Sequence, residues 1–141
     1  MSIESNKATL RAFIDAVNAH DWPKVESLVT PDVVRHGSAP GQERSHGRDS
    51  LLAFLRGEAE AFPDAHESIL FLVAEDDKVA ARLRFRGTQL GQSGPYPPTG
   101  KVLEAEFIGI FRLDGGKIAE AWVEFDNLNS LIQLGHYVPP E

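Results

Sequence analysis

Residues 102–125, VLEAEFIGIFRLDGGKIAEAWVEF, decide the fold. In both halves, 102–113 and 117–125, successive side chains fall into two alternating sets. A period of two is typical of a strand whose faces meet different surroundings. The DGG sequence at 114–116 is a turn signal that joins neighbouring antiparallel strands. The stretch therefore predicts a β-hairpin.

Two further strands are predicted before this hairpin. Residues 68–75, SILFLVAE, have a strand-like composition, and Asp76-Asp77 supplies a turn. In residues 79–88, VAARLRFRGT, apolar side chains alternate strictly with charged ones, which indicates one buried face and one solvated face. The alternating residues are Ala81, Leu83 and Phe85 on one face and Arg82, Arg84 and Arg86 on the other.

Helical periodicity marks the first part of the chain. Apolar residues recur at i, i+3, i+4 and i+7 over about residues 6–20, as on one face of an amphipathic helix. A short second helix, with Asp21 as N-cap, is predicted to run to Val29, and a third helix is stopped by Pro63. A last short helix, over about residues 127–134, ends at a glycine.

Helices followed by antiparallel strands define an α+β fold. We expect one domain over residues 1–141, a cone-shaped curved antiparallel β-sheet with the N-terminal helices packed on its concave face. Residues 37–47 and 91–101 are rich in turn-forming residues and are expected to be loops. A cone of this kind is open at one end, and a pocket is expected there.

The composition restricts the classes of function. The formal net charge is −7 and the basic residues are dispersed, which argues against binding to a nucleic-acid backbone. The chain has no cysteine, so disulfides and thiolate metal sites are excluded. The stretch MSIESNKATL lacks the pattern of a signal peptide, and no apolar run reaches the roughly 20 residues of a membrane span. These features predict a cytoplasmic protein with no membrane partner.

Several common catalytic motifs are missing. There is no G-x-S-x-G elbow, no Walker-type phosphate loop and no dinucleotide fingerprint, which removes serine hydrolases, P-loop NTPases and Rossmann dehydrogenases. No two of the five histidines stand at i, i+4 or in an H-x-H arrangement, so no metal site is expected. The remaining candidates are acids, one histidine and aromatic side chains.

Asp126 stands where the strand pattern changes to a helical one. One interpretation is an N-cap, whose carboxylate accepts a backbone hydrogen bond and has a lowered pKa. The other is a catalytic base beside Phe125 and Trp122, which requires burial that raises the pKa toward neutrality. The pattern alone favours the cap, and the two interpretations predict opposite shifts of the pKa.

Two strands carry acids that a pocket could enclose. Glu106 shares a strand face with Ile108 and is either partly buried with it or exposed where the strand frays. Trp122 shares a face with Glu124 and is either a pocket wall whose N–H can bond a ligand or a surface aromatic.

Four more side chains are candidates. His36 follows the apolar pair Val33-Val34 and either points into the cavity as a proton shuttle or lies half-buried at a strand end. Tyr96 lies on a loop and either folds over the open end of the cone or packs on its rim. The remaining two, which are expected to shape the pocket from the apolar helix faces, are Phe13 and Phe54.

Five segments, taken in order, resemble the SnoaL-like polyketide cyclase or ester cyclase family of the nuclear transport factor 2-like superfamily. They extend over about residues 6–135 and read NKATLRAFIDAVNAHDW, LVTPDVVRH, FPDAHESILFLVAEDDKVAARLRFRGT, PPTGK and FRLDGGKIAEAWVEFDNLNSLIQLG. The ordered set is fairly specific for the family, though not for one activity. The resemblance implies three N-terminal helices and a strongly bent antiparallel sheet around an apolar pocket, often with a homodimer formed through the sheet.

The resemblance also implies a chemistry. In the cyclases an aspartate acts as general acid/base without metal or cofactor, removing a proton next to a carbonyl and so starting an intramolecular aldol ring closure. Asp126 is the position that matches this aspartate. His36 matches a histidine that commonly follows the D-[FYV]-V segment of such proteins, and Trp122 matches the tryptophan of the same strand.

Two departures from the family pattern concern polar pocket positions. Gly109 stands where many relatives have an acid, and Ala121 replaces a histidine. Glu106 or Glu124 would have to compensate.

Three hypotheses for the function follow. The first is a cofactor-free enzyme that transfers protons on a small, mostly apolar, carbonyl-bearing ligand, with Asp126 as base. The second is an enzyme like ketosteroid isomerase or epoxide hydrolase, although the arginines at 82, 84 and 86 do not supply the buried cation that epoxide opening needs. The third is a non-catalytic module that binds a small hydrophobic ligand or dimerises, which the departures at 109 and 121 favour.

Overall fold

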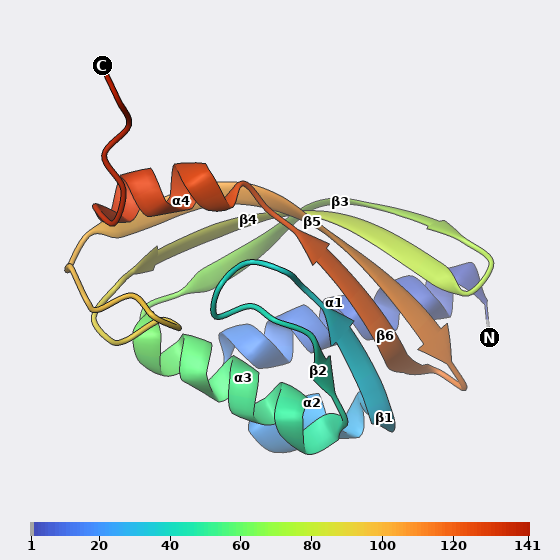
Figure 1. Ribbon diagram of the computed structural model, residues 1–141. Coiled ribbons are helices and arrows are strands. Elements are labelled where there is room, and N and C mark those ends of the chain that lie inside the picture. Colours follow the sequence, from blue (N-terminus) through green and yellow to red (C-terminus); the bar gives the residue numbers. More distant parts are fainter. Residues whose placement is uncertain (1) are drawn as a thin grey trace.

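The computed structural model describes residues 2–141. Three helices, α1 (Ile3–Asn18), α2 (Trp22–Ser27) and α3 (Arg48–Ala61), lie on one face of a curved sheet (Figure 1). The strands of the sheet are β1 (Val29–His36), β2 (Ser45–His46), β3 (His66–Glu75), β4 (Lys78–Thr88), β5 (Val102–Asp114) and β6 (Lys117–Glu124). A fourth helix, α4 (Asn127–Leu134), follows the last strand. This arrangement confirms the predicted α+β fold.

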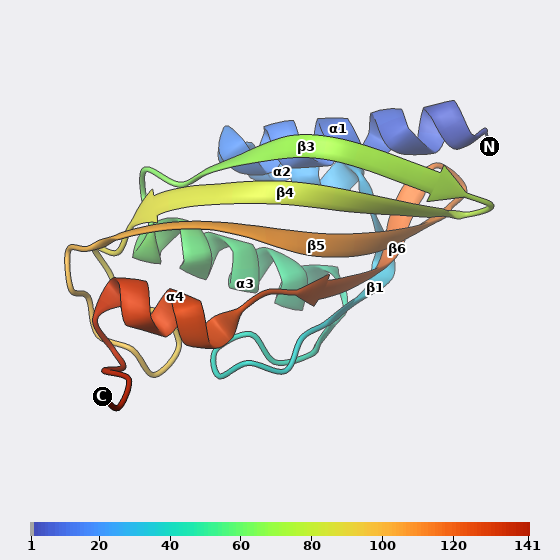
Figure 2. The same ribbon diagram turned by 90° about the horizontal axis from the view of Figure 1, so that it is seen from above.

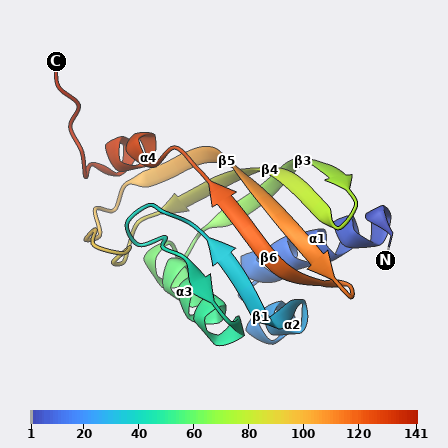
Figure 3. The same cartoon turned by 45° about the vertical axis from the view of Figure 1, so that its right-hand side comes forward.

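The sheet is mixed, which corrects the expectation of a wholly antiparallel one. Its strand order is β2-β1-β6-β5-β4-β3. The pairs β3–β4, β4–β5 and β5–β6 are antiparallel as predicted, but β1 pairs in parallel with β6 (Figure 3). The sequence pattern does not predict β1 because Pro31 interrupts it and its register against β6 shifts between Val29 and Val34. The predicted second helix accordingly ends earlier, at Ser27.

The main core fills the space between the inner face of the sheet and the helices. Leu10 and Ile14 of α1 and Val79 and Leu83 of β4 are almost fully buried there. Burial of one such side chain contributes roughly 1.5–3 kcal/mol. Seen from above, α1 runs alongside β3, the strand at one edge of the sheet (Figure 2). Within residues 2–141, no helix has the length and apolar character needed to cross a membrane.

Candidate active site

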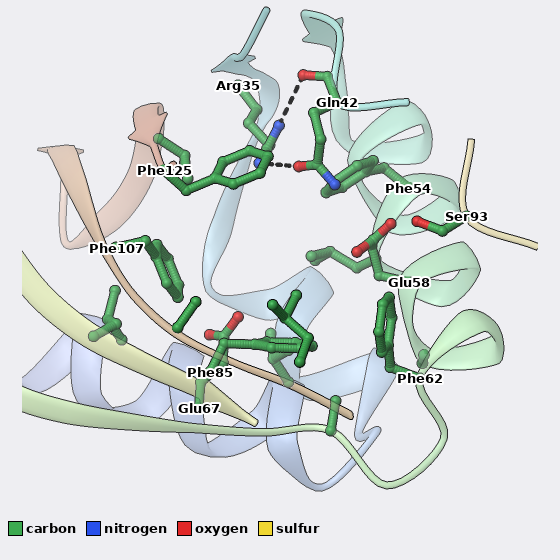
Figure 4. Close-up of a pocket in the computed structure, with 18 of the residues that line it drawn as sticks. Arg35, Gln42, Phe54, Glu58, Phe62, Glu67, Phe85, Ser93, Phe107 and Phe125 are labelled. Carbon is green, nitrogen blue, oxygen red and sulfur yellow. Dashed lines mark hydrogen bonds between the residues drawn. The ribbon is translucent and has the colours of Figure 1, made fainter. Parts of the chain in front are cut away.

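A cavity of about 230 Å³ lies between the inner face of the sheet and the helices α1 and α3. Its walls are mostly apolar and rich in phenylalanine (Figure 4). Phe13 and Phe54 come from the helices, and Phe85 and Phe107 come from β4 and β5. The strands supply alternate residues because successive side chains of a strand point to opposite faces.

Three charged side chains also line this cavity, each from a different element. Arg35 comes from β1, Glu58 from α3 and Glu67 from β3 (Figure 4). Glu67 lies opposite Phe85 in the β3–β4 ladder, so both point to the inner face of the sheet. We refer to Arg35, Glu58 and Glu67 as the charged cluster.

Arg35 is held in one orientation. Its two terminal nitrogens donate hydrogen bonds to Gln42, one to the backbone oxygen at 3.3 Å and one to Oε1 at 2.9 Å. The guanidinium also lies 4.3 Å from the ring centroid of Phe54. Burial lowers the pKa of Arg35, while Glu58 and Glu67 raise it, and an arginine in this setting stays charged near neutral pH. Arg35 is therefore a fixed cation in the cavity wall.

A glycine makes this arrangement possible. A Cβ atom on Gly37 would lie 2.1 Å from the backbone oxygen of Gln42 and 2.9 Å from a terminal nitrogen of Arg35. Any larger residue would therefore push the β1–β2 loop away from Arg35, since backbone and a buried guanidinium have little freedom to move.

The two glutamates have raised pKa values. Burial raises the pKa of Glu67 from 4.5 to about 7, opposed by the charge of Arg35 and assisted by that of Glu58. Burial also raises the pKa of Glu58, while Arg35 and the Gln42 amide lower it. Both side chains keep some accessible surface because the cavity beside them admits a water-sized sphere, but protein surrounds that cavity on most sides. The enclosing protein disfavours the ionised form because it replaces bulk water around the carboxylates.

Asp126 lies outside this cavity and caps α4. Its Oδ1 accepts a hydrogen bond of 2.9 Å from the backbone N–H of Asn129, and its side chain is exposed. Of the two interpretations offered by the sequence, the structure shows the helix cap. The expectation that Asp126 is buried beside Phe125 and Trp122 is corrected accordingly, because its carboxylate is exposed to solvent and does not line the cavity.

His36 and Trp122 lie together on the outer face of the sheet. Their rings stack with centroids 5.3 Å apart, and His36 Nε2 lies 2.6 Å from Oε2 of Glu120. The other oxygen of Glu120 accepts a hydrogen bond of 3.1 Å from Arg112 Nε. His36 and Trp122 therefore do not reach the cavity, which lies on the opposite face of β1 and β6.

Glu106 and Glu124 also lie on the outer face. Glu106 is exposed and forms an ion pair of 3.7 Å with Arg82, and Glu124 is exposed at the end of β6. On β5 and β6 the two alternating sets of side chains point to opposite faces of the sheet, as predicted. The set that faces the cavity is the one that includes Phe107 and Ala121, and not the set that carries Glu106 and Glu124. The physical reason is that the acid-bearing set stays hydrated while the purely apolar set is buried.

Three predicted pocket residues do line the cavity, namely Phe13, Phe54 and Tyr96. Tyr96 belongs to the loop between β4 and β5, and its ring lies 4.9 Å from that of His136, centroid to centroid. Gln89, which is fully buried, holds this loop by donating to the backbone oxygens of Tyr96 and Pro97 at 3.1 Å each.

Sequence reasoning missed Arg35, Glu58 and Glu67 altogether. One signal was available for Glu58, since it follows Phe54 by four residues and so lies on the apolar face of its helix. A charged residue on an otherwise buried face is a candidate for function. Arg35 and Glu67 gave no comparable signal, because Arg35 lies next to the end of its strand and Glu67 next to the beginning of its strand. Charged residues are common at such positions.

The two departures at 109 and 121 have different structural settings. Ala121 lines the cavity, so a histidine at this position would project into it. A Cβ on Gly109 would lie 2.7 Å from the ring of Phe111, which is itself only 5% exposed. The Phe111 ring therefore occupies the space that a side chain at position 109 would need.

A curved sheet that is covered by helices on one face, with an apolar cavity between them, is the architecture of the nuclear transport factor 2-like fold. Within that fold, the model of the SnoaL-like polyketide cyclase family matches residues 7–134, so the chain belongs to this family.

Solved structures agree with this assignment. TsrD from Streptomyces laurentii is 27% identical, with a TM-score of 0.85 and coverage of 97% of this chain and 99% of that chain. IdmH from Streptomyces antibioticus is 30% identical, with a TM-score of 0.77 and coverage of 92% and 98%. A SnoaL-like polyketide cyclase candidate from Jannaschia sp. CCS1 is 23% identical with a TM-score of 0.86, covers 99% and 97%, and supports the fold alone. No curated protein matches the chain.

Proposed function

We propose that the protein transfers protons on a small, mostly apolar, carbonyl-bearing ligand bound in the cavity, with Glu67 as general acid/base. The observation that carries this proposal is the Glu67 carboxyl in an apolar cavity, with its pKa raised to about 7 beside the fixed cation Arg35. A carboxyl with a pKa near the working pH is populated in both protonation states, which suits it to remove a proton and return it.

The proposed reaction begins at the carbon next to the carbonyl. The Glu67 carboxylate takes a proton from this carbon, the C–H bond breaks, and its electron pair moves to the carbonyl oxygen as an enolate. The positive charge of Arg35 favours the developing negative charge, and the apolar walls strengthen that attraction by excluding water. The proton on Glu67 then exchanges with solvent, and transfer of the exchanged proton back to the carbon regenerates the ketone with a solvent proton in place of the original one.

An aldol-type ring closure would extend the same chemistry. The enolate carbon attacks a second carbonyl of the same molecule, a C–C bond forms, and the new alkoxide takes a proton. Glu58 lies on the helix side of the cavity and Glu67 on the sheet side, so one can act as base and the other, when protonated, as acid.

Exchange of α-protons tests this proposal without knowledge of the natural substrate. A neutral bicyclic ketone such as 1-tetralone is incubated with the protein in D₂O, and loss of its α-proton signal is followed by NMR. Glu67→Gln should lower the protein-dependent rate by about 100-fold or more. Glu124→Gln, which changes an exposed glutamate of the outer face, serves as matched control and should leave the rate unchanged.

The same ketone also tests the non-catalytic alternative. Binding without α-proton exchange, and without any effect of Glu67→Gln beyond affinity, would support a module that binds small hydrophobic ligands. The apolar walls and the missing acid and histidine at positions 109 and 121 are compatible with that outcome.

A second enzymatic candidate, epoxide opening, gains support from the charged cluster. This reaction needs one acid to protonate the epoxide oxygen, one carboxylate to activate water and a cation to organise them. Arg35, Glu58 and Glu67 bring these groups to one cavity, a set that the outer-face arginines could not supply. Hydrolysis of 1-methylcyclohexene oxide to the diol, measured by gas chromatography, would favour this reaction over α-proton transfer.

We further propose that two copies of the chain associate through the outer face of the sheet. Ile108 and Ile110 are 45% and 38% exposed on this face, beside the arginines of β4 and the glutamates of β5. Such a surface is self-complementary when a two-fold axis places basic strand against acidic strand. Sedimentation of the wild type and of Ile110→Lys tests the association, and a wild-type protein that sediments as a monomer at micromolar concentration would contradict it.

A further inference from the structure

The strand that carries Glu67 lies at the edge of the sheet. β3 pairs with β4 on one side only, so its backbone groups on the other side need partners from elsewhere. At Glu67 the side chain of Asn18 provides a partner for the backbone N–H and another for the backbone oxygen. The Nδ2 of Asn18 donates to the backbone oxygen of Glu67 at 2.8 Å, and the backbone N–H of Glu67 donates to Asn18 Oδ1 at 2.8 Å.

Asn18 thus takes the place of a neighbouring strand at this single residue. It is the last residue of α1, which runs alongside β3 (Figure 2). Two hydrogen bonds to one residue fix its backbone, and the direction of a side chain on a strand follows from its backbone. The direction of the Glu67 carboxyl into the cavity therefore depends on the amide of Asn18.

Asn18 also stands between the cavity and solvent. Ile14, Asn18 and Glu67 line both the cavity of the charged cluster and a second, more open cavity of about 290 Å³ between α1 and β3. The second cavity is polar, and besides Glu67 its charged or titratable side chains are Arg11, Asp15 and His66. We refer to it as the polar groove. The wall between the apolar site and this polar groove is therefore thin at Glu67.

We propose that Asn18 is the positioning residue of Glu67, holding its carboxyl in the apolar cavity and closing that cavity against the polar groove. This inference rests on the proposed role of Glu67 as acid/base. The groups that face the Glu67 carboxyl across the cavity are Arg35 and Glu58, and those on the groove side are Arg11, Asp15 and His66. Loss of the Asn18 amide opens the wall to water, which favours the ionised carboxylate.

The test follows the Glu67 carboxyl directly by ¹³C NMR of the labelled full-length protein from about pH 4 to about pH 9, a range that brackets both reference and shifted values. The signal is assigned by its loss in Glu67→Gln. The wild type should titrate with a midpoint of about 7. Asn18→Ala should lower this midpoint by about one unit or more, toward the ordinary value of 4.5.

The chain offers a matched control for this substitution. Gln133 forms the same pair of bonds with Glu104 on β5, accepting from its N–H at 2.9 Å and donating to its oxygen at 3.1 Å. Gln133→Ala removes an equivalent clamp on the exposed side of the molecule and should leave the Glu67 midpoint unchanged. A folded Asn18→Ala protein with the wild-type midpoint overturns the proposal.

A measurement on the wild type decides the case if Asn18→Ala does not fold. Hydrogen exchange of the Glu67 amide should be as slow as that of the ladder amides of β4, although Glu67 lies on an edge strand. Fast exchange of the Glu67 amide would show that Asn18 does not hold the backbone of Glu67 and would overturn the proposal. Neither measurement depends on turnover, so failure of the α-proton exchange assay alone removes the proposed reaction and not the placement of Glu67 by Asn18.

Discussion

Burial of Glu67 should make the stability of the fold depend on pH in a defined direction. The pKa of Glu67 is raised from 4.5 to about 7, first by burial. Between these values the native state holds the proton that the unfolded chain has already released. The free energy of unfolding therefore falls as the pH rises through this window, because the native state binds more protons than the unfolded one. Below about pH 4.5 the group contributes no penalty, and above about pH 7 the penalty is complete.

Glu67→Gln isolates this contribution because the amide has nearly the same shape and cannot ionise. The difference between about 7 and 4.5 corresponds to about 3 kcal/mol at 1.36 kcal/mol per pH unit. We expect the variant and the wild type to be similarly stable near pH 4 and the variant to be more stable above pH 7, by up to about 3 kcal/mol. This value already includes the attraction of Arg35 for the ionised Glu67 carboxylate, which opposes the effect of burial.

Urea unfolding of both proteins at several pH values measures the effect. All other titrating groups are common to the two chains, so the difference between their unfolding free energies reports Glu67 and the groups that it contacts. The difference should grow in favour of the variant as the pH rises from about 5 to about 8. A difference that does not change with pH, or one that turns in favour of the wild type, would refute the placement of an ionisable carboxyl in an apolar cavity.

Three further substitutions give distinct outcomes. Arg35→Met removes the cation that opposes the raised pKa of Glu67, so the midpoint of the pH–rate profile for α-proton exchange should move above about 7. The rate at neutral pH should fall roughly tenfold, and an unchanged profile would exclude Arg35 from the site. Asp126→Ala removes a helix cap and should cost about 1 kcal/mol in urea unfolding while the exchange rate stays the same, whereas loss of the rate with retained stability would restore Asp126 as the base. Gly109→Asp places a side chain against the Phe111 ring and should lower stability by roughly 1–3 kcal/mol, seen as a lower Tm, and a wild-type Tm would show that the ring moves freely.

Much of the fold could be predicted because its elements are defined locally. The hairpin of β5 and β6 and the helix α4 follow from alternation, turn residues and a terminal glycine that lie next to one another in the sequence. The pairing of β1 with β6 joins residues about ninety positions apart and leaves no local signal, since Pro31 breaks the pattern of β1. The parallel pair is the part of the fold that only tertiary contacts determine.

The candidate site was harder to predict than the fold for a related reason. Alternation shows which residues share a face but not which face is buried, and on β5 the exposed Ile108 and Ile110 made the outer set look like the inner one. The three members of the charged cluster come from three elements that meet only in the folded chain. The helix cap at Asp126, by contrast, can be read from the sequence, because capping depends on neighbouring residues alone.

The contact between Gly109 and Phe111 constrains how an acid at this position can be gained or lost during evolution. With the Phe111 ring in place, a single change of Gly109 to an acid meets the ring before it can serve any chemistry. A smaller residue at 111 alone leaves an unfilled space beside a glycine in the middle of a strand. In this chain an acid at position 109 therefore requires the Phe111 ring to turn aside, because both groups need the same space.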